Sequence, residues 1–306
     1  MAKIKITSNH FNHINSKISS GVSKKIQQLN LHYSYLSEKE SELLIIDILK
    51  YLLKPKVVFS GSHRKKDWED GWKYNLIKFK KNKSLSSLIP KYFDKFKFHR
   101  INSKFVKSQS RNFEYKLVCM IQYVIFDKYF RNHKNIYEFG AGTGHNLIRL
   151  REINSKANLF SLEWANSGND IIKIYKKIFK DRNIFAYNFD NFNPNHKIKI
   201  KKNSSIFTFA SLEQLGKNYI NIVDYWIKSN PKIIVNIEPM SEFLNPRKIP
   251  EYLSLEYFKK RNYLFNYLKY LENLEKKNKI LILDKIKTGF GSKYIEGYSI
   301  VAWKPI

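Results

Sequence analysis

The segment that most constrains the fold is Ile136-Tyr-Glu-Phe-Gly-Ala-Gly-Thr-Gly-His145, in which a short apolar run meets three glycines at alternate positions. Glycine adopts positive φ at no steric cost, and its missing Cβ lets a backbone approach a ligand closely. Residues 146–150 then begin a predicted helix. A buried strand, a glycine turn and a helix in this order predict a site for a nucleoside-bearing ligand, which the first helical amides would face.

A single carboxylate about twenty residues further along the chain supports this interpretation. The second apolar run, Ala157-Asn-Leu-Phe-Ser-Leu-Glu163, ends in Glu163. In doubly wound α/β folds, an acidic residue at this position accepts hydrogen bonds from ribose hydroxyls. The alternative is a solvated residue at the end of a strand.

Together these residues resemble the class I S-adenosylmethionine-dependent methyltransferases. The first motif of that family is an acidic residue, an apolar residue and then Gly-x-Gly-x-Gly, which Glu138 through Gly144 match. The Gly-x-Gly-x-x-Gly pattern of dinucleotide dehydrogenases fits less well, because the third glycine comes one residue early. The resemblance covers about residues 130–306 and implies S-adenosylmethionine as the cofactor.

The resemblance also implies roles for individual residues. Glu138 and the backbone of residues 140–144 would line the methionine end of the cofactor, and Glu163 would accept both ribose hydroxyls. Asp190 would accept a hydrogen bond from the adenine amino group while Phe189 packs against the ring; an Asx turn is the alternative for Asp190. The predicted cofactor-binding residues are Glu138, Gly140, Ala141, Gly142, Gly144, Glu163, Trp164, Phe189 and Asp190.

From residue 135 onward, strand and helix patterns alternate, which indicates a parallel sheet covered on both faces. A long amphipathic helix is expected over residues 253–277. Two more apolar runs predict a closing antiparallel hairpin, which the family also has. The fold class is therefore α/β, with a doubly wound, mostly parallel seven-stranded sheet. Strands are expected at residues 135–139, 158–163, 184–187, 205–209, 231–237, 279–284 and 298–303.

Residues 1–130 are expected to form a mainly helical cap on a catalytic domain at residues 131–306. The capping-box pattern Ser37-Glu-Lys-Glu40 predicts a helix that ends before Pro55. A second helix is expected over residues 112–130, leading into the first strand of the sheet.

The cap also contains Trp68 and Trp72, which lie four residues apart and are flanked by carboxylates. Aromatic rings beside carboxylates can stack on a sugar or enclose a cation, so these residues are candidates for acceptor binding. The alternative is packing in the core, which the helical spacing equally fits.

Three residues are candidates for catalysis. Glu213 follows the strand at residues 205–209, and Glu238 ends the strand at residues 231–237, so both are expected at the sheet edge where open α/β folds bind ligands. Glu213 is the candidate general base, with a carboxylate at a helix start as the alternative. His145 follows the glycine turn and is a catalytic candidate or a surface residue. Gln214 is a candidate for acceptor binding.

The net charge of +30 raises the question of a nucleic-acid partner. The lysines are scattered, however, and the wealth of Asn, Ile, Tyr and Phe is typical of A- and T-rich codon usage, so nucleic-acid binding is not favoured. No long apolar run or secretory segment is seen, which indicates a cytoplasmic protein without a membrane span. The single cysteine, Cys119, lies in an apolar run and is expected in the core.

The sequence therefore predicts a methyltransferase that acts on a small molecule, with O-methylation of a sugar or surface-glycan precursor as the leading hypothesis. N-methylation of a small amine remains open, as does an RNA-modifying methyltransferase that uses the basic surface. The Asn/Asp-Pro-Pro-Tyr signature of many methyltransferases that act on base amines is absent after the strand at residues 205–209, which counts against a base substrate of that type.

Overall fold

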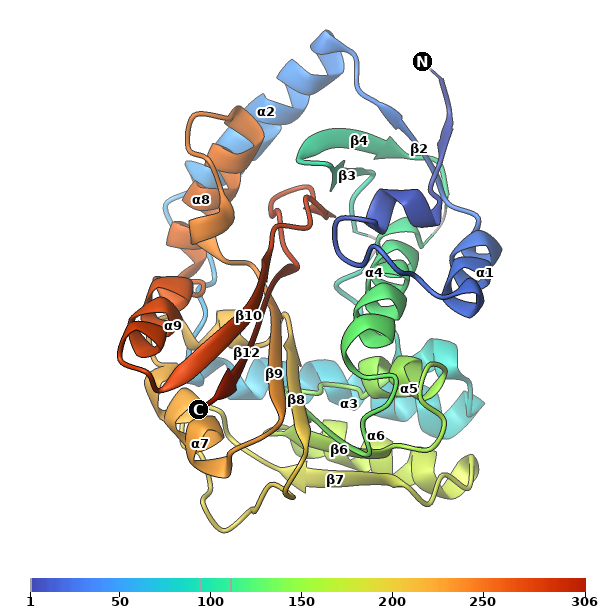
Figure 1. The fold of residues 1–306 in the computed structure, drawn as a ribbon. Helices are drawn as coiled ribbons and strands as arrows, with labels where there is room; N and C mark the ends of the chain where they lie inside the picture. The colour runs from blue at the N-terminus through green and yellow to red at the C-terminus, as the bar shows by residue number, and fades with distance from the viewer. Residues whose placement is uncertain (1, 94, 111) are drawn as a thin grey trace.

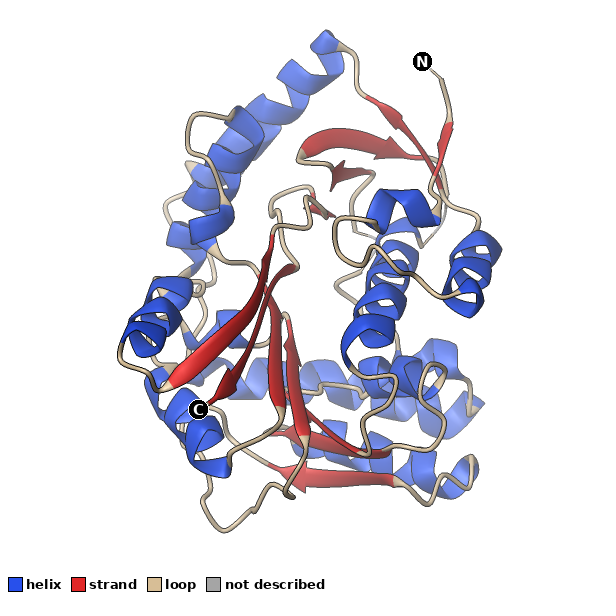
Figure 2. Cartoon of the chain, viewed as in Figure 1, coloured by secondary structure: helices blue, strands red, loops and turns tan. Residues whose placement is uncertain are grey.

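The computed structural model describes residues 2–93, 95–110 and 112–306. A seven-stranded sheet with the order β10-β12-β9-β8-β5-β6-β7 forms its centre (Figures 1 and 2). Only β12 is antiparallel to its neighbours, so the predicted mostly parallel sheet and closing hairpin are confirmed. The strands are β5 (Asn135–Phe139), β6 (Asn158–Glu163), β7 (Ile184–Asn188), β8 (Ser205–Phe209), β9 (Ile233–Glu238), β10 (Ile280–Ile286) and β12 (Ser299–Pro305).

Helices cover both faces of this sheet. Successive side chains of a strand point to opposite faces, so each strand contributes apolar side chains to a core on either side. Ile136 and Phe207 belong to one buried cluster, which includes apolar side chains of α4 (Phe113–Tyr129), α5 (His145–Arg151) and α6 (Asn166–Ile178). Their neighbours Tyr137 and Ile206 belong to a second buried cluster with α7 (Ile220–Ser229) and α9 (Tyr267–Lys276). The sheet is therefore doubly wound, as predicted.

The prediction of a single long helix over residues 253–277 is wrong. The chain forms two helices there, α8 (Ile249–Arg261) and α9, separated by a short loop. Asn262 ends α8 and Asn266 precedes α9, with φ angles of 52° and 58°. Asparagine tolerates this left-handed conformation better than most residues, so it ends a helix without a glycine. Leu264 in the loop between the two helices is buried as well, so the apolar spacing that predicted one helix continues across the break.

The N-terminal region contains the predicted helices, including the capping box at the start of α2, where Ser37 Oγ accepts a hydrogen bond from Glu40 N at 3.2 Å. It also contains a five-stranded antiparallel sheet that the sequence did not predict. The helices are α1 (Ser20–Leu29), α2 (Glu38–Leu52) and α3 (Lys65–Asn82), with short 3-10 turns η1 (Ser8–Phe11), η2 (Ser62–Arg64) and η3 (Leu85–Leu88).

This second sheet joins the two halves of the chain. Its order is β1 (Ile4–Lys5), β2 (His32–Tyr35), β4 (Lys104–Ser108), β3 (Phe98–Ile101) and β11 (Gly291–Ser292). The edge strand β11 comes from the segment between β10 and β12, and its Gly291 pairs with Arg100 of β3. The cap is thereby hydrogen-bonded to the closing hairpin of the larger sheet.

Two further expectations concern single features. Cys119 is buried in α4, as expected for a core thiol. Within the described residues, no helix combines the length and apolarity that a membrane span requires.

Candidate functional site

A cavity of about 630 Å³ lies at the carboxyl ends of the parallel strands. The segments that follow β5, β6, β7 and β8 form one wall, which is the edge where open α/β sheets bind ligands. The opposite wall comes from the N-terminal region, including α3 and the segment around Tyr92 and Phe93. The site therefore needs both halves of the chain.

The glycine turn lines this cavity and requires glycine at its alternate positions. Gly140, Gly142 and Gly144 have φ angles of 76°, 56° and 76°, a region that residues with a Cβ rarely adopt. A Cβ on Gly144 would lie 2.1 Å from Cδ1 of Ile172 in α6, and one on Gly142 would lie 3.1 Å from the Trp72 ring. These contacts explain the spacing of the motif: each glycine lets the turn pass close to another element.

Glu163, at the end of β6, lines the cavity and holds the glycine turn. Its Oε2 accepts a hydrogen bond from Gly142 N at 2.7 Å, and its Oε1 accepts one from Ala165 N at 3.0 Å. Burial raises the pKa of Glu163 to about 7, although these backbone amides favour the ionised form. Each carboxylate oxygen has a second lone pair, so Glu163 retains acceptor capacity toward the cavity.

Glu138 lies below the cavity and is not part of its lining. Its Oε1 accepts a hydrogen bond from Nδ2 of Asn146 at 2.6 Å, which ties β5 to the first turn of α5. Burial raises the pKa of Glu138 well above its usual value. Glu138 supports the turn through Oε1, and its Oε2 is buried without a partner among the described residues, so the expected contact with a ligand stays a prediction.

The segment after β7 places Phe189 in the cavity wall, as expected, and directs Asp190 elsewhere. Oδ1 of Asp190 accepts a hydrogen bond from Phe192 N at 2.9 Å, which is the Asx turn proposed as its alternative role. Asn191 and Phe192 line the cavity in its place. The Phe192 ring stacks on Trp164 with 5.6 Å between centroids, so the predicted residue Trp164 also lies at this end.

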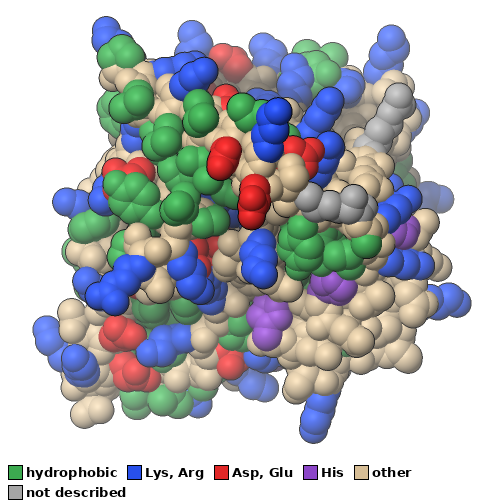
Figure 3. All heavy atoms as spheres, turned by 90° about the horizontal axis from the view of Figure 1, so that it is seen from above, with side chains coloured by type: hydrophobic (Ala, Val, Ile, Leu, Met, Phe, Trp, Pro, Cys, Tyr) green, Lys and Arg blue, Asp and Glu red, His purple; other side chains and the backbone are tan. Residues whose placement is uncertain are grey.

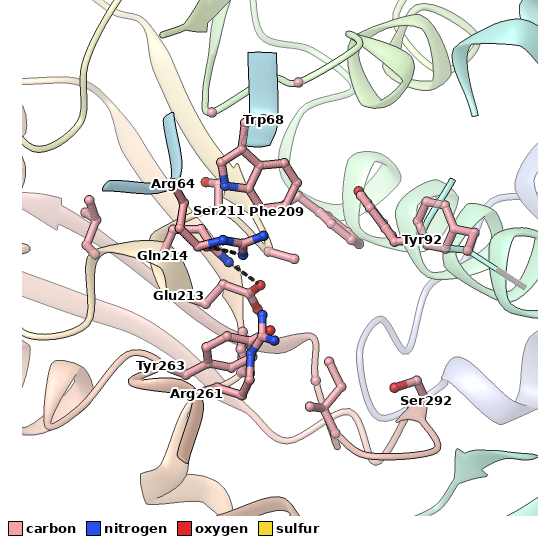
Figure 4. A pocket seen from close by; sticks show the side chains of 18 of the residues that line it. Arg64, Trp68, Tyr92, Phe209, Ser211, Glu213, Gln214, Arg261, Tyr263 and Ser292 are labelled. Atoms are coloured by element: carbon pink, nitrogen blue, oxygen red, sulfur yellow. Dashed lines mark hydrogen bonds between the residues drawn. The ribbon is translucent and has the colours of Figure 1, made fainter. Parts of the chain in front are cut away.

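Glu213 and Gln214 lie in the short turn η4 (Leu212–Leu215) and face the other end of the cavity (Figure 4). Glu213 Oε1 accepts a hydrogen bond from Gln214 Nε2 at 3.0 Å; its buried Oε2 has no partner in hydrogen-bond geometry among the described residues, although the Tyr263 side chain lies close to the carboxyl group. Burial, reinforced by the nearby Glu238, raises the pKa of Glu213 to about 8. A buried, unpartnered carboxyl oxygen beside a cavity is suited to accept a proton from a bound molecule.

Two arginines flank Glu213 in Figure 4. Arg64 stacks over the Trp68 ring at 5.2 Å and donates a hydrogen bond to Gln214 Oε1 at 3.5 Å. Arg261, at the end of α8, packs beside the ring of Tyr263 at 5.5 Å. This end of the cavity therefore combines a carboxyl group, two guanidinium groups and aromatic rings.

Glu238 does not line the cavity, contrary to expectation. Its Oε1 accepts hydrogen bonds from the amides of Ser211 and Leu212, both at 3.1 Å, and its Oε2 accepts one from Glu213 N at 3.2 Å. Burial raises the pKa of Glu238 to about 7. Its contacts assign it a positioning role, because it holds the backbone that presents Glu213.

His145, at the start of α5, is buried and lines the cavity, so it is not a surface residue. Thr143 Oγ1 donates its hydrogen to Leu88 O at 2.7 Å, so it can only accept at its 3.0 Å contact with His145 Nδ1. Nδ1 therefore carries the proton, and Nε2 is the acceptor. Burial, with help from Arg149, lowers the pKa of His145 to about 3, which keeps the ring neutral.

Trp68 and Trp72 both line the cavity, with 5.3 Å between ring centroids. Trp72 is buried against Gly142, whereas Nε1 of Trp68 is buried without a partner among the described residues. Trp72 thus packs on the glycine turn, and Trp68 lies under the guanidinium group of Arg64 (Figure 4).

Several residues of this site carry no local sequence signal. Arg64 and Arg261 occur in the basic runs His63-Arg-Lys-Lys66 and Lys259-Lys-Arg261, where they resemble solvated charge. Asn191 was not predicted, because the neighbouring carboxylate of Asp190 was the expected hydrogen-bonding group. The cavity also includes aromatic residues that are scattered along the chain: Tyr51, Tyr92, Phe96, Tyr257, Tyr263, Tyr294 and Tyr298. Across the described residues, no cluster of histidine, cysteine and carboxylate side chains is arranged to hold a metal ion.

The seven-stranded sheet, its single antiparallel strand and the glycine turn after the central strand β5 form the class I methyltransferase fold that the resemblance implied. No protein-family model matches the chain, and no curated protein matches it in sequence.

Solved structures similar to this chain include an O-methyltransferase (NcsB1) from neocarzinostatin biosynthesis, in complex with S-adenosylmethionine and 2-hydroxy-5-methyl naphthoic acid; the identity is 11%, the TM-score 0.44, and the match covers 63% of this chain and 58% of that one. Magnesium protoporphyrin IX methyltransferase from Synechocystis PCC 6803 matches with 9% identity, a TM-score of 0.43 and coverages of 62% and 79%. The [4+2]-cyclase SpnF matches with 11% identity, a TM-score of 0.49 and coverages of 81% and 97%.

Proposed function

We propose that the protein is an S-adenosylmethionine-dependent methyltransferase that methylates a hydroxyl group of a small molecule, and that the acceptor is a sugar or surface-glycan precursor. One observation carries this proposal: a single cavity joins the glycine turn and Glu163 at one end to the unpartnered carboxyl oxygen of Glu213 at the other. A cofactor site and a proton acceptor thus share one cavity.

The cofactor end of the cavity fits S-adenosylmethionine. The left-handed glycine turn brings backbone close to the cavity, and the buried Glu163 carboxylate has lone pairs left for two ribose hydroxyls. Phe189 and the stacked pair of Trp164 and Phe192 offer apolar surface for an adenine ring. When bound, the cofactor supplies a methyl group on a sulfonium sulfur, which is a good leaving group.

The residues of the chain then have to orient the acceptor, exclude water and take one proton. As the acceptor oxygen forms its bond to the methyl carbon and the carbon–sulfur bond breaks, Glu213 Oε2 accepts the hydroxyl proton. Glu238 keeps Glu213 in place through the three backbone amides of residues 211–213. With a pKa of about 8, the ionised form of Glu213 is a stronger base than an ordinary carboxylate, and the fraction of Glu213 that is ionised increases as the pH rises toward 8.

The acceptor end favours a hydroxyl compound over a cationic amine. Arg64 and Arg261 flank Glu213, and their positive charge would repel an ammonium group. The aromatic rings of Trp68 and Tyr263 offer flat surfaces on which a sugar ring can pack. The guanidinium groups also suit an acceptor with carboxylate or phosphate substituents, as many activated sugars carry.

Calorimetry with S-adenosylmethionine tests the cofactor assignment. We expect binding by the wild-type protein and at least about tenfold weaker binding by Glu163→Ala, which is roughly 1.4 kcal/mol. Asp170→Ala is the matched control, because the half-exposed Asp170 on α6 pairs with Lys173 and does not line the cavity. Absence of binding by folded wild-type protein would refute the proposal.

A transfer assay with labelled cofactor tests the acceptor class. The proposal expects label on hydroxyl groups of anionic sugars and none on small amines. Label on RNA, with binding that weakens steeply with salt, would overturn the small-molecule assignment.

A further inference from the structure

Helix α2 and the loop after it carry a row of exposed apolar side chains that the proposed catalytic function does not use. The row, here called the apolar strip, comprises Leu43, Ile46, Leu49, Leu53, Val58 and Phe59, with exposed fractions of 58%, 48%, 40%, 80%, 55% and 52%. Single exposed apolar residues are normal on a protein surface, but a contiguous group marks an interaction site.

The part of the strip on α2 is one face of an amphipathic helix, and Val58 and Phe59 belong to the loop after it. Leu43, Ile46 and Leu53 fall on one side of α2 at the helical period of 3.6, while Leu44 and Ile48 face inward and pack against α8. The inner face of α2 is thus already buried within the protein. The outer face has no partner in the described chain that covers it.

Basic residues border the strip. Lys50, Lys54 and Lys56 are exposed in the same segment. Of the three exposed acidic residues there, Asp47 is paired with Lys293, which leaves Glu38 and Glu42 beside these lysines and the exposed Lys39. Figure 3, which looks down on this end of the molecule, shows hydrophobic side chains gathered on one side, with many lysine and arginine side chains and fewer acidic ones around them.

We propose that the apolar strip docks the protein on an anionic lipid surface. A helix with an apolar face and flanking lysines lies in the interface of such a membrane, where apolar side chains enter the headgroup boundary and lysines attract anionic lipids. A second copy of this chain is a poorer occupant, because two molecules with a net charge of +30 each repel one another.

The strip also adjoins the cavity. Val58 belongs to the strip and lines the cavity, and Tyr51, on the last turn of α2, lines it as well. Docking through the strip would therefore bring the cavity close to the lipid headgroups. This gives the interaction a use: acceptors held at a membrane surface come within reach of the site.

Sedimentation with vesicles tests the docking and requires neither cofactor nor acceptor, so its outcome is separate from that of the proposed methyl transfer. The probes are vesicles of phosphatidylcholine alone and vesicles with three parts in ten of phosphatidylglycerol. We expect binding to the anionic vesicles that weakens with added salt, and little binding to the neutral ones.

Two double variants separate the strip from general surface stickiness. Ile46→Gln with Leu53→Gln should weaken binding to anionic vesicles at least about tenfold, because two apolar side chains no longer insert. Ile77→Gln with Ile220→Gln removes exposed apolar side chains on α3 and α7 and should bind within about twofold of wild type. Near-ultraviolet circular dichroism checks that both remain folded.

Three outcomes would overturn the proposal. They are absence of wild-type binding to anionic vesicles, equal binding by the wild type and the strip variant, and a wild-type dimer in light scattering that the strip variant converts to a monomer. The last would assign the strip to contact between copies of the chain.

Discussion

At the scale of single residues, Glu213 carries most of the chemical argument, because it joins an unpartnered oxygen to a raised pKa. We expect Glu213→Gln to lower kcat at least about 100-fold, since the amide cannot accept the proton. The Kd for S-adenosylmethionine should stay within about threefold, because Glu213 lies at the other end of the cavity. Steady-state kinetics and calorimetry measure the two quantities.

The pH profile gives this prediction a second readout. Only the ionised carboxylate accepts a proton, so the wild-type kcat should rise with pH and level off above the pKa of about 8. Glu213→Gln should lose that rise. A variant that keeps both the turnover and the pH profile of the wild type would remove Glu213 from the mechanism.

Gly142 tests the close approach of the glycine turn. Valine there would force an unfavourable left-handed backbone and press on the Trp72 ring, so Gly142→Val should weaken cofactor binding at least about tenfold. Gly71→Ala is the control: Gly71 is helical, and a Cβ there meets nothing within 4 Å. The control should bind like the wild type, and equal affinity of all three proteins would contradict the assignment of the turn.

At the scale of elements, a single carboxylate fixes α3 on α6. Glu69 of α3 accepts hydrogen bonds from Asn166 N at 2.6 Å and Ser167 N at 3.0 Å, which are free amides at the start of α6. Glu69→Ala should therefore lower the free energy of unfolding by about 1 kcal/mol, as loss of a helix cap does. Urea unfolding checks this, with the exposed neighbour Asp70→Ala as control. Equal losses in both variants would refute the cap.

The elements also show what the sequence can and cannot predict. The strands of the large sheet were predicted to within two residues because the central strands β5, β6, β8 and β9 are largely apolar and buried, and the half-exposed edge strands β7 and β10 still begin with apolar runs. The small sheet escaped prediction because its strands are short and partly polar, as in His32-Tyr-Ser-Tyr35. Its edge pair joins Arg100 to Gly291, and no local pattern reports a contact between residues so far apart in the chain.

Within the candidate site, too, some residues could be predicted from the sequence and others could not. The glycine turn and Glu163 were predictable, since they follow strands of one βαβ unit and their geometry is local. Arg64 and Arg261 were not, because the fold alone distinguishes them from the surrounding surface charge. Glu138 and Glu238 were placed on the correct strands, but sequence spacing could not show that Glu138 accepts a hydrogen bond from the Asn146 side chain and Glu238 from backbone amides.

At the scale of the whole molecule, the site makes stability depend on pH. Burial raises the pKa of Glu163 and Glu238 to about 7 and that of Glu213 to about 8, whereas in the unfolded chain each carboxyl ionises near its ordinary value of about 4.3. Between these values the folded state binds more protons than the unfolded state. The free energy of unfolding should therefore fall as pH rises through this window, and level off above about pH 8.

Comparison of variants isolates the contribution of one group from the titration of the eight histidines. We expect the loss of unfolding free energy between pH 6 and 8.5 to be smaller in Glu213→Gln than in the wild type by about 2 kcal/mol, because the amide does not titrate. The exposed Glu42→Gln should retain the wild-type difference. Urea unfolding at the two pH values measures all three proteins. Equal losses in all of them would mean that Glu213 is ionised throughout in the folded protein, and the rise in kcat near pH 8 would then need another source.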